Sequence, residues 1–211
     1  MLTKSAVSTT IVLLLCSITY AGTLTFDGIA SGTKLQGSSY AYDNRVFFSG
    51  DFRATDHSEW EWGLPHSGSN VLTSLGKPSP NTNPFIGFGY FTTHDYDPDP
   101  VRSVSAFFST QTGAMVRVTA YRPGVSDYVP VVSTVVGAAG ESWDNRLVEL
   151  STTPDLPFEL IEFEGVNSPD DLLGFCLDDM TITLIPEPSS LLALAGGLAA
   201  LGFPLIRRRR R

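Results

Sequence analysis

Three aspartates near the two ends of the central region carry the hard oxygen ligands that calcium prefers. Asp27 follows the run Leu24–Phe26, and Asp178 and Asp179 lie in the last apolar run, 174–184. Calcium takes roughly six to eight oxygen ligands, which converge from different parts of a chain. If the first and last strands pair, these carboxylates meet, and the residues then predict a structural calcium site. The alternative is that backbone amides in a turn satisfy the carboxylates.

The pair Asp178-Asp179 carries a further expectation. Adjacent residues of a β-strand point to opposite faces of its sheet, so one of the two carboxylates is expected to face the core. A buried carboxylate needs a cation or several hydrogen-bond donors. This requirement is the second reason to expect a bound ion here.

Two tryptophans separated by one residue, Trp60 and Trp62, share one face if their segment is extended. Exposed aromatic rings stack on the apolar faces of sugars, while carboxyl, amide and imidazole groups bind the hydroxyls. The sequence therefore predicts a carbohydrate site. Its polar members are close in sequence to the tryptophans: Asp56, His57, His66 and Asn70. The alternative is that both rings cover the core beneath a long loop.

Catalytic patterns are missing from the sequence. The three histidines, His57, His66 and His94, are scattered, and there is no His-Glu-x-x-His, no Gly-x-Ser-x-Gly and no phosphate-binding glycine loop. The carboxylate pair of a glycoside hydrolase is spaced in three dimensions rather than along the chain, so a hydrolase stays open as an alternative. The prediction is a protein that is not an enzyme.

An all-β sandwich is the fold that must position these residues. Short runs rich in Val, Ile, Thr, Phe and Tyr recur, separated by Gly, Pro, Asn and Asp, without a long helical period before the last residues. Within two of these runs, 116–121 and 180–184, apolar and polar residues alternate, as in strands with one solvated face. The expected strands are Thr23–Phe26, Arg45–Ser49, Phe85–Thr92, Val101–Ser109, Met115–Tyr121, Tyr128–Val136, Arg146–Leu150, Phe158–Glu164 and Gly174–Leu184.

The residues between these strands show one long stretch without periodicity, Asp51–Pro84, which we expect to be irregular. Binding residues are frequent on such long loops. There is no internal repeat. The central region, residues 22–184, is therefore predicted to be one domain with a core of its own.

Both ends of the chain indicate export. Lys4, the apolar run 6–18 and the small residue Ala21 predict a signal peptide over residues 1–21. At the other end, Leu191–Ile206 is uncharged, and about 16 helical residues span about 24 Å, slightly less than a bilayer core. Five arginines, 207–211, follow and predict the side that stays in the cytoplasm. The tail therefore predicts a single transmembrane helix.

The charge of the chain excludes some partners. The net charge is −8, with 14 basic and 22 acidic residues. Lys4 and the terminal arginines supply six of the basic residues, and Glu187 is the one acid of the tail. The central region thus keeps 8 basic and 21 acidic residues, a net charge of −13. Such a surface repels nucleic acid and anionic lipid, and it suits cations or neutral, hydroxyl-rich partners. The alternative is that the acidity serves only solubility.

Cysteine content agrees with export. Cys16 lies in the predicted signal peptide, which leaves Cys176 as the single cysteine of residues 22–184. One cysteine forms no internal disulfide. Because Cys176 lies in the apolar run 172–177, we expect it to be buried as a small hydrophobic residue. A reactive surface thiol is the alternative.

The tail resembles a known sorting signal. Pro186-Glu187-Pro188-Ser189-Ser190, followed by the apolar stretch and the arginines, is similar to the PEP-CTERM signal of bacterial surface proteins. The resemblance covers residues 185–211. It implies that an exosortase-like protease acts at Pro186, Glu187 and Pro188, while the chain is anchored in the inner membrane. The mature protein would then reach the cell surface or the extracellular space.

Pieces of the central region resemble galactose-binding-like jelly-roll domains, which are frequent in PEP-CTERM proteins. The similar segments occur in the family's order: 24–28, 65–72, 101–108, 116–124, 161–165 and 175–181. The resemblance implies a jelly-roll sandwich and a structural calcium near Asp27 and Asp178. The function expected from the whole sequence is an exported surface or matrix protein that binds carbohydrate, such as an exopolysaccharide. A surface structural protein without a specific ligand is the alternative.

Overall fold

The computed structural model of this chain describes residues 20–37, 45–56, 65–74, 83–91, 96–125 and 127–185. By its internal contacts the chain divides into two units, and residues 21–184 form one of them. Residues 1–19 of the expected signal peptide, the sorting motif and the tail helix lie outside the described residues, as do His57, Trp60 and Trp62. Tyr20 and Ala21, the last two residues of that expected peptide, belong to the first strand. Within the described ranges, no helix is long and apolar enough to cross a membrane.

The described part of residues 21–184 is all-β, as predicted. Its one helix is a short 3-10 turn, η3 (Pro169–Leu173), which begins with a capping box between Ser168 and Asp171. The strands are β1 (Tyr20–Leu24), β2 (Lys34–Gly37), β3 (Val46–Asp56), β4 (Asn70–Ser74), β5 (Phe85–Phe91), β6 (Tyr96–Pro98), β7 (Val101–Thr110), β8 (Val116–Pro123), β9 (Tyr128–Val136), β10 (Trp143–Ser151), β11 (Leu160–Gly165) and β12 (Phe175–Leu184).

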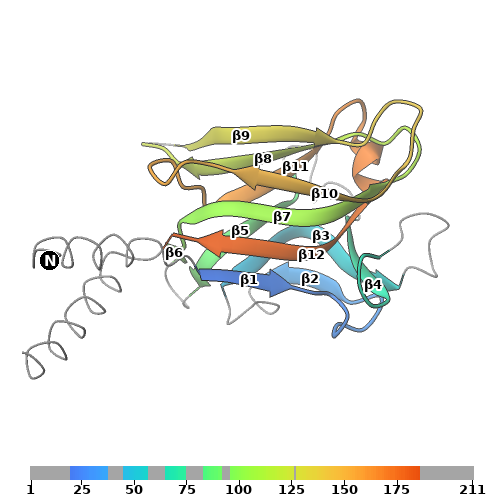
Figure 1. The fold of residues 1–211 in the computed structure, drawn as a ribbon, viewed down its shortest axis with the longest axis horizontal. Helices are drawn as coiled ribbons and strands as arrows, with labels where there is room; N and C mark the ends of the chain where they lie inside the picture. Colours follow the sequence, from blue (N-terminus) through green and yellow to red (C-terminus); the bar gives the residue numbers. More distant parts are fainter. Residues whose placement is uncertain are drawn as a thin grey trace, which may run out of the picture. The chain divides into compact units, whose positions relative to one another are not determined.

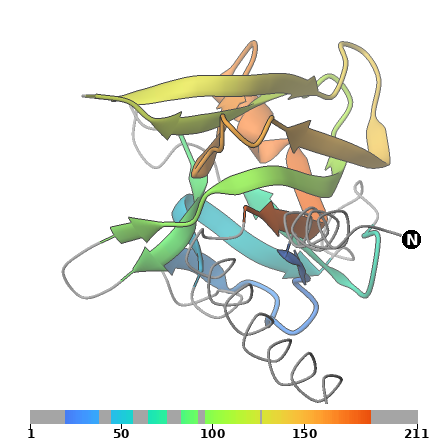
Figure 2. The same cartoon turned by 60° about the vertical axis from the view of Figure 1, so that its left-hand side comes forward.

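One continuous path of hydrogen-bonded strands forms the domain, in the order β10-β7-β12-β4-β3-β5-β11-β8-β9. Every pairing along this path is antiparallel. The two ends of the path, β10 and β9, contact each other, so the sheet folds back into a nearly closed sandwich (Figures 1 and 2). Strand β1 adds to β12, β2 to β3 and β6 to β5.

Aromatic rings fill the interior between the layers. Phe52, Phe163 and Phe175 are fully buried, and the Phe163 ring lies 5.6 Å from that of Phe52 and 5.3 Å from that of Phe175, centroid to centroid. Strands supply this core by alternation. In β8, Val116, Val118 and Ala120 are buried and Arg117 is exposed, as the predicted alternation requires, whereas Thr119 is buried as well.

The expectation of one irregular stretch over residues 51–84 is wrong in two places. Strand β3 continues to Asp56 through Gly50-Asp51, a pair that interrupts the apolar pattern in the sequence. Strand β4 was not predicted because it has no alternation. All five of its residues are buried, since β4 lies inside the path between β12 and β3.

The cysteine prediction is confirmed. Cys176 is a free, buried thiol in β12, opposite Ser109 of β7. Burial raises the pKa of this thiol to about 12, so it stays protonated at neutral pH and is a poor nucleophile. The residue therefore acts as part of the core.

Candidate functional site

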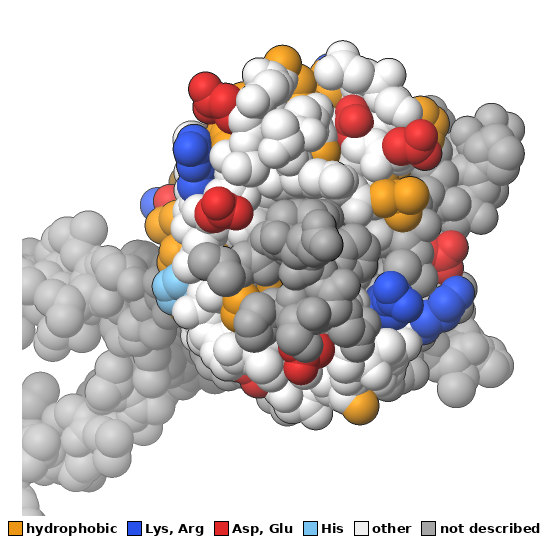
Figure 3. Space-filling model, turned by 90° about the vertical axis from the view of Figure 1, so that its right-hand side faces the viewer, with side chains coloured by type: hydrophobic (Ala, Val, Ile, Leu, Met, Phe, Trp, Pro, Cys, Tyr) orange, Lys and Arg blue, Asp and Glu red, His pale blue; other side chains and the backbone are white. Residues whose placement is uncertain are grey.

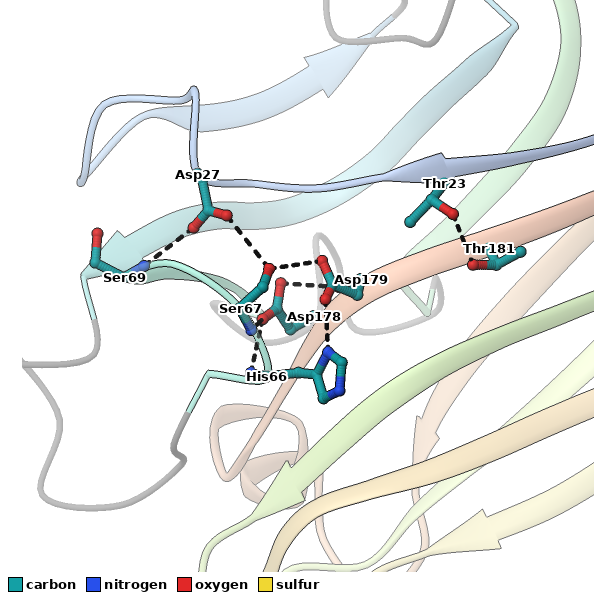
Figure 4. A network of polar contacts seen from close by, with 8 residues as sticks. All are labelled: Thr23, Asp27, His66, Ser67, Ser69, Asp178, Asp179 and Thr181. Atoms are coloured by element: carbon teal, nitrogen blue, oxygen red, sulfur yellow. Dashed lines mark hydrogen bonds and ion pairs between the residues drawn. The ribbon is translucent and has the colours of Figure 1, made fainter.

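The segment that leads into β4 is fixed by three aspartates from distant parts of the chain (Figure 4). The buried carboxylate of Asp178 is at the centre. Its Oδ2 accepts the backbone N–H groups of His66 and Ser67, at 2.8 and 3.0 Å, and its Oδ1 accepts the N–H of Asp179 at 2.8 Å. We call Asp27, His66, Ser67, Asp178 and Asp179 the aspartate network.

Asp27 holds the other side of the same segment. Its Oδ1 accepts the N–H of Ser69 at 3.0 Å, and its Oδ2 lies 3.3 Å from the Ser67 hydroxyl. That hydroxyl also lies 2.8 Å from Oδ1 of Asp179. A serine has one hydroxyl hydrogen, so it donates to one of these two carboxylates at a time. At this point the network has more negative oxygens than donors.

His66 extends the network onto the face of the sheet. Its Nδ1 is 2.6 Å from Oδ2 of Asp179, and its ring is stacked on that of Phe107 in β7, with centroids 3.4 Å apart and planes 7° from parallel. The imidazole is 40% exposed, whereas the Asp179 side chain is 13% exposed. The imidazole is thus oriented both by a carboxylate and by an aromatic platform, and it still reaches solvent.

Two backbone features allow this convergence. Gly68 has a φ of +54°, and a Cβ at this position would collide with the carboxylate of Asp27, so glycine satisfies both the turn and the close approach. Asp179 has a φ of +45°, and the β12–β7 register shifts between Asp178 and Thr181. The expectation that the two adjacent carboxylates point to opposite faces is therefore wrong. The irregularity turns both toward residues 66 and 67.

The buried carboxylate of Asp178 is electrostatically costly. Removal from water raises its pKa above the usual value, and the nearby Asp179 acts in the same direction. The hydrogen bonds from Ser67, Asp179 and His66 act against this rise. The amides thus compensate part of the desolvation, which is the role that backbone donors have at buried acids.

These residues give a mixed fit to a calcium ion. Asp27, Asp178 and Asp179 supply six carboxylate oxygens, but the donors of residues 66–70 already approach them. An ion would have to replace some of these donors. Within the described ranges, no group of three or more His, Cys, Asp or Glu side chains has an arrangement ready to hold a metal. In the described residues, the aspartate network consists of hydrogen bonds that hold three chain segments together.

The structure places the predicted sugar-site residues in different environments. Asp56 ends β3 and pairs in register with Asn70 at the start of β4. The side chain of Asn70 is buried, and its amide donates to the carbonyl of Ile29 at 2.7 Å, so Asn70 fixes a turn. His66 is half exposed.

Sequence reasoning did not single out Ser67 or Phe107. Ser67 contributes a backbone amide and a hydroxyl, and backbone donors have no signature in residue type. Phe107 lies in an alternating strand and gave no sign that its ring would meet His66. The Ser-Gly-x-Asn segment, residues 67–70, was the available signal for the turn.

Acidic side chains are dispersed over the end of the domain that Figure 3 shows, among uncharged atoms. The negative charge is therefore not gathered into a single patch on this face. A dispersed charge of this kind gives little attraction for one multivalent cation and leaves room for uncharged ligands.

Comparisons with solved structures show a likeness in fold. No protein-family model and no curated protein matches this chain. The K2 cleaved adhesin domain of Lys-gingipain, known from a crystal structure, is similar in fold over 77% of this chain and 99% of that domain, with 16% identity and a TM-score of 0.46. At this identity and TM-score, the likeness supports no conclusion about the activity of this chain.

Proposed function

We propose that this chain is an exported bacterial surface or matrix protein whose β-sandwich binds carbohydrate, with Trp60 and Trp62 as stacking residues. One observation carries the proposal. The segment with both tryptophans leaves β3 at Asp56 and returns at residues 65–70, where the aspartate network holds the chain. The aspartate network therefore fixes the position of His66, which follows that segment closely in the sequence.

The fixed position of these residues matters because sugars bind through shallow contacts. Each contact offsets only part of the entropy lost on ordering the ligand and the loop. Hydrogen bonds that hold the return of a loop before binding reduce this cost. Many copies on one surface would then add avidity to a weak single site.

The sandwich is also part of the proposal. We assign it to the galactose-binding-like jelly-roll type on the basis of the segment resemblances and the antiparallel, nearly closed strand path. The fold alone does not give the ligand, since sites are added to such scaffolds in many ways. The ligand has to be tested directly.

Replacing Trp60 by alanine should abolish retention of the full-length protein on the exopolysaccharide of its own host. The reason is the loss of a stacking surface. The melting temperature should stay within about 1 °C, because the proposal has this ring contact the sugar and not the core. Affinity electrophoresis in gels with and without the polysaccharide measures retention. Trp143→Ala is the matched control, because Trp143 is half-buried on β10 beside Arg146 and should leave retention unchanged.

Two outcomes would refute this role. If Trp60→Ala melts many degrees lower without a glycan-specific change, the ring packs on the core. If the folded variant is retained as strongly as the parent, the Trp60–Trp62 segment is not the site. A parent protein that binds no polysaccharide would favour a surface structural protein, and one that cleaves it would show the hydrolase alternative.

Sorting is proposed to depend on Pro186-Glu187-Pro188. The prolines lack amide hydrogens and disfavour helix, so the motif stays extended and accessible to an exosortase-like protease at the inner membrane. Expression of Glu187→Ala in the native host should leave an unprocessed, membrane-bound chain, as seen by immunoblots of cell fractions. The exposed Asp155, replaced by alanine, is the control for loss of an acid elsewhere. Normal maturation of Glu187→Ala would refute the motif's role.

A structural calcium at the aspartate network is the remaining part of the proposal. The excess of carboxylate oxygens around the Ser67 hydroxyl supports it. Millimolar calcium should raise the melting temperature by several degrees, since a ligand at a hundredfold excess over its Kd adds about 2.7 kcal/mol and 1 kcal/mol corresponds to about 3 °C in a domain of this size. A chelator should reverse the rise, and Asp27→Asn should reduce it. Identical melting curves in calcium and chelator would exclude the ion.

A further inference from the structure

The outer face of strands β10, β7 and β12 carries mainly serine and threonine side chains. The inner face is defined by Val104, Ala106 and Phe108 of β7, which are buried in the core. Alternation places Ser103, Ser105 and Phe107 on the opposite, outer face, and they are half-buried. The same reasoning applies to the neighbouring strands, because Val148 and Leu150 of β10 and Leu177, Met180 and Ile182 of β12 belong to the core.

The strand registers arrange this outer face in three cross-strand rows. Each row takes one residue from β10, one from β7 and one from β12. The rows are Ser151-Ser103-Thr183, Glu149-Ser105-Thr181 and Leu147-Phe107-Asp178. Strand β1 continues the middle row, since the hydroxyls of Thr23 and Thr181 are 3.0 Å apart. We call these rows the hydroxyl face.

Exposed charge is limited to one position of these rows. Among the nine row positions, Glu149 is the one exposed charged side chain, because Asp178 is buried under residues 66 and 67. The surrounding domain carries 21 acidic and 8 basic residues. A hydroxyl both donates and accepts a hydrogen bond, so rows of serine and threonine match a ligand that is itself neutral and covered with hydroxyls.

One end of the hydroxyl face has a flat apolar wall. Leu147 is 60% exposed, and beside it the Phe107 ring carries the stacked imidazole of His66. Figure 4 shows the second ring nitrogen of His66 directed away from Asp179. Apolar faces of sugar rings pack on such surfaces, and an imidazole nitrogen at the edge can bond a hydroxyl.

We infer that the hydroxyl face binds a chain of a neutral polysaccharide, with Leu147 and the His66–Phe107 stack at one end and the serine and threonine rows beneath the sugars. The inference rests on the proposed carbohydrate function, and it adds a contact on the sheet to the contact proposed for the Trp60–Trp62 segment. The row residues come from strands of a rigid sheet, so little ordering cost accompanies binding.

Substitutions that add a long charged side chain to the face provide the test. Ser105→Lys fills the middle row beside Glu149, and Leu147→Lys changes a residue that is 60% exposed. Ser133→Lys on β9 is the matched control, an exposed serine paired with Thr119 of β8. Full-length proteins in mild detergent are compared by affinity electrophoresis against hydroxyethyl cellulose, the host exopolysaccharide and alginate, and each variant's melting temperature is recorded.

We expect Ser105→Lys and Leu147→Lys each to weaken binding to the neutral polymer, or to a neutral host polysaccharide, by roughly tenfold, the effect of about 1.4 kcal/mol. Ser133→Lys should bind as the parent does. Because Leu147 is exposed, a folding defect of Ser105→Lys would leave Leu147→Lys as the deciding variant.

The opposing outcomes separate the inference from the proposed function. A parent that binds polysaccharide while both lysine variants bind equally well overturns the hydroxyl face and leaves the carbohydrate function intact. Preference of the parent for alginate overturns the neutral ligand. Dissociation of a dimer by Leu147→Lys, without a change in glycan binding, assigns the face to a second copy of the chain and overturns the inference. A parent that binds none of the polymers removes the proposed function and the inference together.

Discussion

Replacing Phe163 by alanine should lower the free energy of unfolding by about 3–5 kcal/mol, the usual cost of removing a buried phenylalanine ring. The ring is fully buried in β11 and contacts the rings of Phe52 and Phe175, so its loss leaves a cavity at the meeting point of three strands. At about 3 °C per kcal/mol, the melting temperature should fall by about 9–15 °C. Thermal unfolding followed by circular dichroism measures the change.

Val135→Ala is the control for this experiment. Val135 is 38% exposed on β9, and its truncation should cost less than about 0.5 kcal/mol. A Phe163→Ala protein that melts within 2–3 °C of the parent, roughly the shift of 1 kcal/mol, would contradict the central place of this ring in the core.

Asp178→Ala should destabilise the domain by about 3 kcal/mol. The substitution leaves the backbone N–H groups of His66, Ser67 and Asp179 without their acceptor, and each buried unpaired donor costs about 1–3 kcal/mol. The net loss is smaller than the sum, because removal of a desolvated carboxylate, whose pKa is raised by burial, returns part of that cost. Chemical unfolding in urea measures the difference.

Asp178→Asn should lie between the parent and Asp178→Ala, because its single amide oxygen can accept from one side of the network while its NH₂ group faces the donors on the other. The exposed Asp155, changed to alanine, should have little effect. Equal stability of Asp178→Ala and the parent would mean that water replaces the carboxylate without loss, and the network would then not be a source of stability.

The all-β class was predictable because several strands are amphipathic. In residues 180–183 of β12, burial follows the alternation of apolar and polar residues, and in β8 the apolar residues Val116, Val118 and Ala120 are buried while Arg117 is exposed. Strand β4 and the second half of β3 escaped prediction for opposite reasons. Strand β4 is buried on both faces and shows no alternation. Strand β3 continues through a glycine and an aspartate, residue types that normally end strands.

The candidate site was predictable only in its acids. Asp27, Asp178 and Asp179 could be expected to meet because the first strand can pair with the last, and the structure does bring them together around Ser67. Their partners were not predictable, since most are backbone amides of residues 66–70. The orientation of Asp179 depends on a positive φ and a register shift, which residue types do not specify.

The pairing of β1 with β12 sets the order in which this chain can fold. Among the described strands, β1 pairs with β12, so the first strand waits for the last strand of the same domain, which ends at Leu184. One edge of β4 also stays unpaired until β12 is available. Contacts between such distant residues give a high contact order and slow folding, because a long loop must close first. Under the proposed export from the N-terminus, the domain would therefore stay incomplete, with an open β-edge, until residue 184 has crossed the channel.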